Sequence, residues 1–434
     1  MKLVVTVLEE TAEAAIEAMR NLDGDHDLVE IRAERFPSID LHAVRAATAK
    51  PLILTYRNTP GTTDAERRRP PLRAIVEAGI DLVDIEWRED VAIENPSRTV
   101  LSHHDYEGMR DVESIFAAMR AHNCAHTKLA AAPKTLAENE RLLRLLPPIA
   151  SRQTPATIIG MGERGLYTRI LAPFRGSELA FVAGSTIAAP GQLTLARALD
   201  IYSRTPQRAE KVFAVAGDPA GHSLSPSIHN ALFREKRVPA AYTIASFARF
   251  GEIAEAFLRG EPCGLSVTSP FKDEAFALAR SIGAEIGSNA LRAEAVNTLV
   301  NVNGNIVADN TDVDGFAALI PRDTAKAAII GAGGTARAAR VALEDAGIPF
   351  VRFNRTVEKA DAPLAALRDF DGDLVIDTLP GQVDVAVPPC RVYLEAAYTA
   401  ARDVAAETRI GGLELLRAQA VRQHQLFMKV FDGI

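Results

Sequence analysis

The chain has 434 residues, of which 47% are hydrophobic and 24% charged, and its formal net charge is −7. This length predicts two or three domains with separate hydrophobic cores, and the acidic balance argues against a nucleic-acid or anionic-membrane partner. No apolar run reaches the ~20 residues needed to cross a bilayer, and the chain starts as a strand and not as a leader, so we expect a cytoplasmic protein.

Apolar runs recur about every 25 residues through the first half of the chain. Segments of helical spacing, such as Ala12–Leu22 and Val112–His122, lie between most of them. Alternating strands and helices predict a closed (β/α)8 barrel over residues 1–204, with an open doubly wound sheet as the alternative. The expected strands are Leu3–Val7, Leu28–Ile31, Leu52–Tyr56, Leu82–Ile85, Val100–Ser102, Thr127–Ala130, Thr157–Gly160 and Leu179–Val182.

Polar residues lie at or just beyond the ends of these expected strands, and in a barrel such positions face one mouth. A lysine within an apolar strand, Lys128, loses solvation, and its neutral amine becomes available as a Schiff-base nucleophile. A nearby histidine can take a proton from the carbon beside the iminium, and arginines can hold a carboxylate. Each residue taken singly also fits a solvated strand-end charge. The set comprises Glu30, Arg32, Arg57, Glu86, His103, His104, Lys128, Arg169 and Gln192.

The segments DLVEIR, LTYR, SHHD, HTKLA, MGERGLYTR and APGQ resemble type I 3-dehydroquinate dehydratase across about residues 1–200. The resemblance implies a metal-free dehydration, with Lys128 as the nucleophile and His104 as the general acid/base. Relatives often carry a glutamate after the third-strand arginine where this chain has Pro60 and Gly61, which leaves open what orients His104. The substrate contacts implied are Glu30, Arg32, Arg57, Arg169 and Gln192.

The cysteines Cys124, Cys263 and Cys390 are few, odd in number and far apart, so a disulfide framework is not expected. His122, Cys124 and His126 alternate along the chain. No second cluster would complete a coordination shell around them, so we expect no metal site.

The polar segment Ser203–Glu210 breaks the pattern and predicts a domain boundary. A strand over Lys211–Ala216 follows, and then a loop carries Ser223 and Ser225, which fit either a carboxylate site or an ordinary helix N-cap. Further along, Lys272 and Asp312 could position a substrate hydroxyl and shuttle its proton during hydride transfer, with a surface ion pair as the alternative.

A glycine-rich stretch, Ala327–Ala336 (AAIIGAGGTA), predicts a strand, a tight turn and a helix start that binds a pyrophosphate. Gly331 permits the turn, and Gly333 lets the backbone approach the phosphates. The next strand ends in amide, basic and hydroxyl groups where an NAD site has an acid, which favours the 2′-phosphate of NADP. These residues are Asn354, Arg355 and Thr356, followed by Lys359.

The ordered motifs GDPAGHSLSP, VTSPFK, AVNT, NTD, GAGG, NRT and GLELLRAQ resemble shikimate dehydrogenase over about residues 211–434. By that resemblance Lys272 and Asp312 are the catalytic pair, although Ser266 stands where the family usually has asparagine. The implied substrate contacts are Ser223, Ser225, Thr268, Asn297, Tyr398 and Gln419. The implied NADP contacts are Gly331, Ala332, Gly333, Gly334, Thr335, Asn354, Arg355, Thr356, Lys359 and Gly412.

The second resemblance also implies a substrate-binding domain over 211–315 and a Rossmann NADP-binding domain over 320–405. The segment 406–434 would form a closing helix that packs back on the substrate domain and brings Gln419 to the cleft. Between Thr356 and Asp373 the chain is short, which suggests a trimmed Rossmann half.

Together the two resemblances imply a fused shikimate-pathway enzyme of aromatic amino acid biosynthesis. It would dehydrate 3-dehydroquinate to 3-dehydroshikimate and then reduce that product to shikimate with NADPH. Two alternatives remain: a second domain that prefers quinate or another hydroxylated cyclohexane acid with NAD, and a non-enzymatic sensor. Retention of both lysines, His104 and Asp312 argues against a sensor, and a homo-oligomer is compatible with the sequence.

Overall fold

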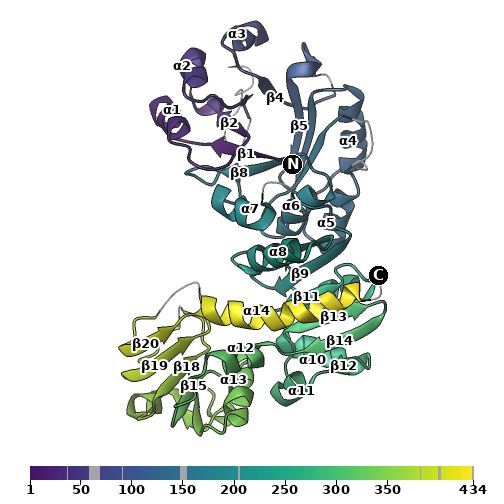
Figure 1. Ribbon diagram of the computed structural model, residues 1–434. Coiled ribbons are helices and arrows are strands. Elements are labelled where there is room, and N and C mark those ends of the chain that lie inside the picture. Colours follow the sequence, from purple (N-terminus) through teal and green to yellow (C-terminus); the bar gives the residue numbers. More distant parts are fainter. Residues whose placement is uncertain are drawn as a thin grey trace. The chain divides into compact units, whose positions relative to one another are not determined.

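The computed structural model describes residues 1–36, 38–57, 69–89, 91–146, 154–203, 206–381, 383–398 and 402–432. The chain forms two compact units (Figure 1). The first contains Met1–Glu210 and Phe233–Ser246, and the second contains Lys211–Leu232 and Phe247–Ile434. No helix among the described residues has the length and apolar character that crossing a bilayer requires.

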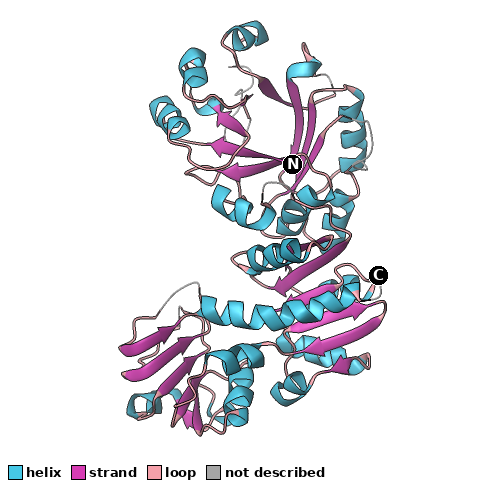
Figure 2. Ribbon diagram, viewed as in Figure 1, coloured by secondary structure: helices cyan, strands magenta, loops and turns pink. Residues whose placement is uncertain are grey.

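Eight parallel strands in the order β7-β6-β5-β4-β3-β2-β1-β8 form the core of the first unit, and helices lie outside them (Figure 2). The eight expected strands are confirmed to within three residues at each end. The strands are β1 Lys2–Val7, β2 Leu28–Arg32, β3 Leu52–Thr55, β4 Leu82–Glu86, β5 Thr99–Asp105, β6 His126–Ala131, β7 Ala156–Gly160 and β8 Leu179–Ala183.

The sheet curls into a barrel whose last seam, between β7 and β8, is made differently from the others. Among the described residues no strand ladder joins β7 to β8. Instead, Glu178 N donates to Ala156 O at 2.9 Å, and Thr157 Oγ1 accepts from Leu179 N at 3.0 Å. The expected (β/α)8 barrel is therefore present, closed at this seam by single hydrogen bonds.

The helices of this unit follow their strands and begin where the sequence offers caps. Thr11 accepts from Ala14 N before α1, and Thr135 forms a capping box with Glu138 at the start of α5. The bounds are α1 Ala12–Arg20, α2 Leu41–Ala46, α3 Leu72–Glu77, α4 Val112–Ala121, α5 Leu136–Leu143, α6 Leu166–Leu171 and α7 Leu195–Tyr202. Strand β10, Ala240–Ser246, belongs to this unit, where Thr243 donates to the Tyr167 carbonyl.

The second unit contains a mixed sheet and a parallel sheet. In the mixed sheet, the strands of this unit follow the order β9-β11-β13-β14-β12, and β13 runs antiparallel to both of its neighbours. The strands are β9 Lys211–Gly217, β11 Gly264–Val267, β12 Glu285–Ile286, β13 Thr298–Val302 and β14 Asn305–Asp309. The helices that lie wholly or partly in this unit are α8 Ser225–Lys236, α9 Phe250–Leu258, α10 Lys272–Ser281, α11 Ser288–Ala293 and α12 Asp312–Leu319.

The parallel sheet, of order β17-β16-β15-β18-β19-β20, contains the expected strand, glycine turn and helix. The segment between β16 and β18 holds only 3-10 turns and the two-residue strand β17, so this half is trimmed as the short sequence suggested. The elements are β15 Ala327–Ile330, α13 Gly334–Asp345, β16 Phe350–Asn354, β17 Ala362–Pro363, β18 Leu374–Asp377, β19 Cys390–Glu395 and β20 Ala406–Ile410.

The chain closes with α14, Gly412–Met428, the yellow helix of Figure 1. It packs against α12, where Gly315 lies under Gln419: a Cβ added to Gly315 would approach the Gln419 Cβ to 3.0 Å. Any side chain at this position would force the neighbouring atoms of α14 to shift, so glycine favours the close approach of the two helices. The contact places the polar side chains of α14 beside the start of α12.

Candidate active sites

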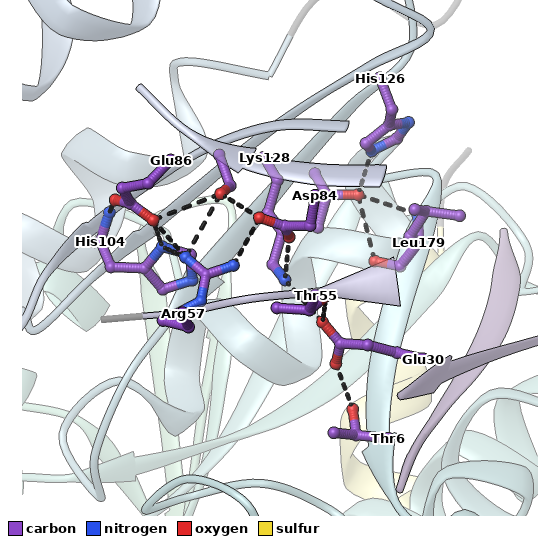
Figure 3. A network of polar contacts seen from close by, with 12 residues as sticks. Thr6, Glu30, Thr55, Arg57, Asp84, Glu86, His104, His126, Lys128 and Leu179 are labelled. Atoms are coloured by element: carbon purple, nitrogen blue, oxygen red, sulfur yellow. Dashed lines mark hydrogen bonds and ion pairs between the residues drawn. The ribbon is translucent and has the colours of Figure 1, made fainter. Parts of the chain in front are cut away.

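A polar network occupies the carboxyl half of barrel strands β2 to β6 (Figure 3). The parallel register pairs Glu86 with Ser102 and Ser102 with Lys128. Because paired residues face the same side and side chains alternate along a strand, Asp84 and His104 share this face. The barrel thus brings residues far apart in the sequence into one cluster.

Lys128 lies at the centre of the cluster and is only 4% exposed. Its Nζ lies 3.3 Å from Asp84 Oδ2 and 3.6 Å from Glu30 Oε1, and 3.7 Å from the ring centroid of Phe181. The lysine is buried, as its apolar strand suggested, and its amine contacts two carboxylates as well as the Phe181 ring. Burial raises the pKa of Glu30, but the combined attraction of Lys128, Arg32 and Arg57 lowers it overall.

Arg57 connects the two carboxylates of β4. Its Nη2 donates to Asp84 Oδ1 at 2.6 Å, and its Nη1 donates to Glu86. Burial alone would raise the pKa of both carboxyls. Arg57 and Lys128 hold the pKa of Asp84 well below its usual range, and His104 with Arg57 lowers the pKa of Glu86 to about 2. Both groups are therefore ionised at neutral pH.

Glu86 also fixes His104, which answers the question that the sequence left open. Glu86 Oε1 accepts from His104 N at 2.8 Å, and Oε2 lies 2.9 Å from His104 Nδ1. Arg57 Nη1 contacts the same ring nitrogen. Burial and the charge of Arg57 lower the pKa of His104 to about 4, so the imidazole is neutral at pH 7. Pro60 and Gly61 lie outside the described residues.

The second unit holds a separate lysine and carboxylate pair. Lys272 Nζ donates to Asp312 Oδ2 at 2.5 Å and to Thr335 Oγ1 at 2.8 Å. These residues lie at the first turns of α10, α12 and α13, so three helix starts converge on one amine. Asn297 Nδ2 donates to Asp312 Oδ1 at 2.8 Å and holds the carboxylate from its other oxygen.

A cavity of about 230 Å³ lies against the glycine turn. Gly331 has φ +113°, which favours glycine, and a Cβ added at Gly333 would meet nothing within 4 Å. The turn leads into the N-terminus of α13, so backbone N–H groups face open space as an anion site requires. The lining residues are Gly331, Ala332, Ala336, Arg337, Arg340, Arg352 and Lys359.

Residues 3–207 match the family model of type I 3-dehydroquinase. Residues 215–299 match the model of the shikimate dehydrogenase substrate binding domain. The chain joins a member of the type I 3-dehydroquinase family to a member of the shikimate dehydrogenase family. We call the part that contains residues 3–207 the dehydratase domain and the part that contains residues 215–299 the dehydrogenase domain.

Two curated relatives match most of the chain. The chloroplastic bifunctional 3-dehydroquinate dehydratase/shikimate dehydrogenase of Arabidopsis thaliana is 29% identical over 77% of this chain, which spans 61% of that protein's length. The shikimate biosynthesis protein AroDE of Chlamydia pneumoniae is 29% identical over 82% of this chain, a match that spans 79% of the length of AroDE.

Two solved structures are also similar. Dehydroquinate dehydratase and shikimate dehydrogenase from S. pombe AroM is 20% identical, with a TM-score of 0.38, over 99% of this chain and 98% of that chain. Shikimate 5-dehydrogenase from Thermus thermophilus, solved with NADP(H) and shikimate, is 25% identical, with a TM-score of 0.43, over 52% of this chain and 94% of that chain.

Three expected substrate residues of the dehydratase domain lie outside the central cluster. Arg32 Nη2 pairs with Glu34 Oε1 at 2.5 Å. Arg169 donates from Nε to Gly160 O at 3.0 Å and lines a cavity of about 20 Å³ with Phe181, the ring that contacts Lys128. Gln192 is connected to the cluster through Thr6. Gln192 Nε2 lies 3.4 Å from Thr6 Oγ1, and this hydroxyl donates to Glu30 at 2.8 Å.

In the dehydrogenase domain the expected substrate residues form two groups. The first surrounds the start of α8, where Ser223 Oγ accepts from Ser225 N at 3.3 Å and the ring of Tyr398 lies 6.2 Å from that of His222. Thr268 follows β11, the neighbour of β9 in the sheet. The second group surrounds Asp312 and contains Asn297 and Gln419, whose Oε1 accepts from Thr311 Oγ1 at 2.9 Å.

Apart from Gly412, the expected cofactor residues lie at or just beyond the carboxyl ends of β15 and β16. Thr335 contacts Lys272, and Lys359 lines the cavity. Asn354 Nδ2 donates to Thr356 O at 3.2 Å, while Arg355 is exposed. Gly412 begins α14, and an added Cβ would approach the Ala397 backbone to 2.6 Å, so glycine is required there by packing.

Sequence reasoning missed Asp84, Arg340 and Arg352. The signal for Asp84 was an aspartate two residues before Glu86 in an apolar strand, which places both on one face. Arg340 lies two helical turns into α13 and Arg352 lies on β16, so their approach to the glycine turn depends on the parallel packing of these elements.

Proposed function

We propose that the dehydratase domain converts 3-dehydroquinate to 3-dehydroshikimate through a covalent intermediate on Lys128. The observation that carries this proposal is the register of β5 and β6, which puts a buried amine and the neutral His104 on one face of adjacent strands. Such a pair supplies a nucleophile and a base to one bound molecule. The arginine and the carboxylates of the cluster fix both groups in place.

In this reaction the Lys128 amine adds to the ketone carbon, and a water molecule leaves to give an iminium. His104 removes a proton from the adjacent carbon, the electron pair forms the new double bond, and the hydroxyl group beyond it leaves as water with the proton that His104 returns. A second water molecule hydrolyses the iminium and releases the amine. Glu86 holds His104 so that its free ring nitrogen faces the substrate.

We further propose that the dehydrogenase domain reduces 3-dehydroshikimate to shikimate. The contact of Lys272 with both Asp312 and Thr335 supports this role, because it joins the proton donor to the glycine turn. NADPH, when bound, supplies the hydride. The Lys272 ammonium gives a proton to the ketone oxygen, and Asp312 and Asn297 hold the ammonium in position.

NADP is the proposed cofactor because the end of β16 is basic. Arg355 and Lys359 follow the strand, and Arg340 and Arg352 line the adjacent cavity. Guanidinium groups bind a phosphate through paired hydrogen bonds, whereas the ribose hydroxyls of NAD need an acid. The basic donors of this region fit the 2′-phosphate.

The two reactions follow one another, which places the protein in the shikimate pathway of aromatic amino acid biosynthesis. We propose a cytoplasmic location, supported by three cysteines that are all free thiols. The proposed binding partners are the small molecules 3-dehydroquinate, 3-dehydroshikimate and shikimate. We also propose that the protein can form a homo-oligomer, which sedimentation would test.

The direct test supplies 3-dehydroquinate and NADPH and follows oxidation of the reduced cofactor. Lys128→Ala should abolish NADPH oxidation with 3-dehydroquinate and leave the rate with 3-dehydroshikimate unchanged. Lys134→Ala, which removes an exposed lysine of the same domain, is the matched control and should leave both rates unchanged. Loss of both activities in the Lys128 variant, or of neither, would contradict the proposal.

A further inference from the structure

Gln423 lies on α14 one turn beyond Gln419, and its side chain is 1% exposed. Its Oε1 accepts from Ser266 Oγ at 2.6 Å and lies 3.1 Å from His229 Nε2. Its Nε2 donates to Thr298 Oγ1 at 2.8 Å and to the carbonyl oxygen of Asn297 at 3.3 Å. No motif in the sequence marked this residue.

The chemistry of these partners fixes the direction of each hydrogen bond. A carbonyl oxygen only accepts, so the nitrogen of the Gln423 carboxamide must face Asn297 O. Burial and the neighbouring His424 lower the pKa of His229 to about 3, so His229 is neutral. Because its Nε2 faces the oxygen end of the carboxamide, this nitrogen carries the proton and donates. The Oε1 atom of Gln423 therefore accepts from both His229 and Ser266.

From Gln423 the donors continue in one direction toward the proposed catalytic pair. Thr298 Oγ1 accepts from Gln423 and donates to Asn297 Oδ1 at 2.8 Å. Asn297 Nδ2 then donates to Asp312 Oδ1 at 2.8 Å, and Asp312 Oδ2 accepts from Lys272. We name Gln423, Thr298, Asn297 and Asp312 the Gln423 relay. Each member is buried, so a lost donor leaves its partner without water to replace it.

Thr311 also contacts Asn297, but it binds the side chain of that residue, whereas Gln423 binds its backbone carbonyl. Thr311 N also donates to Asn297 Oδ1, at 2.8 Å, so the end of the Asn297 amide that faces Asp312 is fixed without Gln423. Gln423 instead fixes the backbone of Asn297 and the hydroxyl of Thr298. Its role is therefore to hold the position of the Asn297 side chain, and with it that of the Asp312 carboxylate.

We propose that Gln423 is a positioning residue for the reduction, acting through Thr298 and Asn297 on the Asp312–Lys272 pair. The inference rests on the proposed dehydrogenase function. Displacement of Asp312 moves the Lys272 proton relative to the ketone oxygen, which slows the chemical step. The cofactor cavity lies against the glycine turn and the basic residues of α13 and β16, so its affinity should not change.

The test compares Gln423→Met with Gln425→Met, a control that makes the same substitution at an exposed position two residues away. Gln423→Met should lower kcat for 3-dehydroshikimate reduction about tenfold, the effect of ~1.4 kcal/mol. The KM for NADPH should stay within about twofold, and the dehydratase rate of the same chain should be unchanged. Gln425→Met should match the wild type.

Thr298→Val tests whether Gln423 acts through Thr298. This variant also tests the proposal if Gln423→Met fails to fold. Thr298→Val should lower kcat as Gln423→Met does, Thr298→Ser should restore it, and the double variant should be no slower than the slower single variant, because both changes break one chain. A double variant whose loss of kcat is the product of the two single losses would overturn the relay. An unchanged kcat in either single variant would also overturn it. If the wild type itself reduces no 3-dehydroshikimate, the proposed function fails, and the inference fails with it.

Discussion

The two sites place a lysine in opposite surroundings. Lys128 lies between two carboxylates that are themselves bound to Arg57 or held by buried hydroxyls, so the site is a closed set of charges. Within the described ranges, Lys272 pairs with one carboxylate, that of Asp312, which the neutral Asn297 amide holds, and its amine also donates to the Thr335 hydroxyl. Removal of one member of a closed set leaves a buried charge without its partner, whereas loss of a neutral group costs a hydrogen bond.

The comparison therefore predicts that the dehydratase site is the less tolerant of substitution. In that domain a single change should affect folding as well as rate. In the dehydrogenase domain the same kind of change should alter rate or cofactor choice while the fold is kept. The predictions below test this difference, from the largest expected effect to the smallest.

Asp84→Asn should have the largest effect on stability. The variant removes the carboxylate that both Arg57 and Lys128 contact, and it leaves Arg57 with Glu86 and Lys128 with Glu30. Because two buried ion pairs are broken, the free energy of unfolding of the dehydratase domain should fall by ~3–5 kcal/mol, measured by urea denaturation. Glu113→Gln, which breaks the exposed pair with Arg141, is the control and should cost at most ~1 kcal/mol. Equal losses in the two variants would contradict the account of the network.

Glu86→Gln should slow dehydration by roughly tenfold to a hundredfold, a part of the 10²–10⁴ that a positioned acid/base contributes. Glu86 raises the pKa of His104, so its removal should also move the acid limb of the rate profile to lower pH. In the wild type His104 must be neutral to accept a proton. Because its pKa is about 4, activity should be lost only as the pH falls toward that value.

The pH profile of kcat/KM with 3-dehydroquinate measures both effects. Reduction of 3-dehydroshikimate by the same variant is the internal control and should be unchanged. An acid limb near the ordinary histidine value of ~6.5 would show that burial and Arg57 do not set the protonation of His104. No shift in the variant would show that Glu86 does not raise the pKa of His104.

Arg355→Ala should have a smaller effect, confined to cofactor affinity. The KM for NADPH should rise roughly tenfold to a hundredfold, the cost of losing a charged hydrogen bond of ~1.5–3 kcal/mol, and the KM for NADH should change little. Arg368→Ala, which removes another exposed arginine of the same domain, provides the control. A similar rise for both cofactors would argue against binding of the 2′-phosphate.

Much of the fold followed from local patterns. The barrel strands appeared as apolar runs at regular spacing, and the glycine turn appeared as a strand followed by GAGG, because both depend on residues adjacent in the chain. The seam between β7 and β8 could not be predicted from local patterns, because it depends on the distance between Thr157 and Leu179 after the sheet has curled.

The candidate sites were predicted less completely, for a similar reason. Lys128 stood out as a lysine within an apolar strand, and His104 stood out as a histidine just beyond a strand end. The bond from Glu86 to His104 depends on the register of β4 against β5, which pairs Glu86 with Ser102, and a strand sequence does not encode its neighbour's register. Gln423 reaches Thr298 across 125 residues, so no local pattern could mark it.

The most direct test of the central claim is chemical trapping of the proposed intermediate. The protein is incubated with 3-dehydroquinate and sodium borohydride, and its peptides are weighed by mass spectrometry. The account predicts one stable adduct, on the peptide that contains Lys128, and none in the Lys128→Ala variant. An intact enzyme that dehydrates the substrate without any adduct, or with the adduct on another lysine, would contradict it.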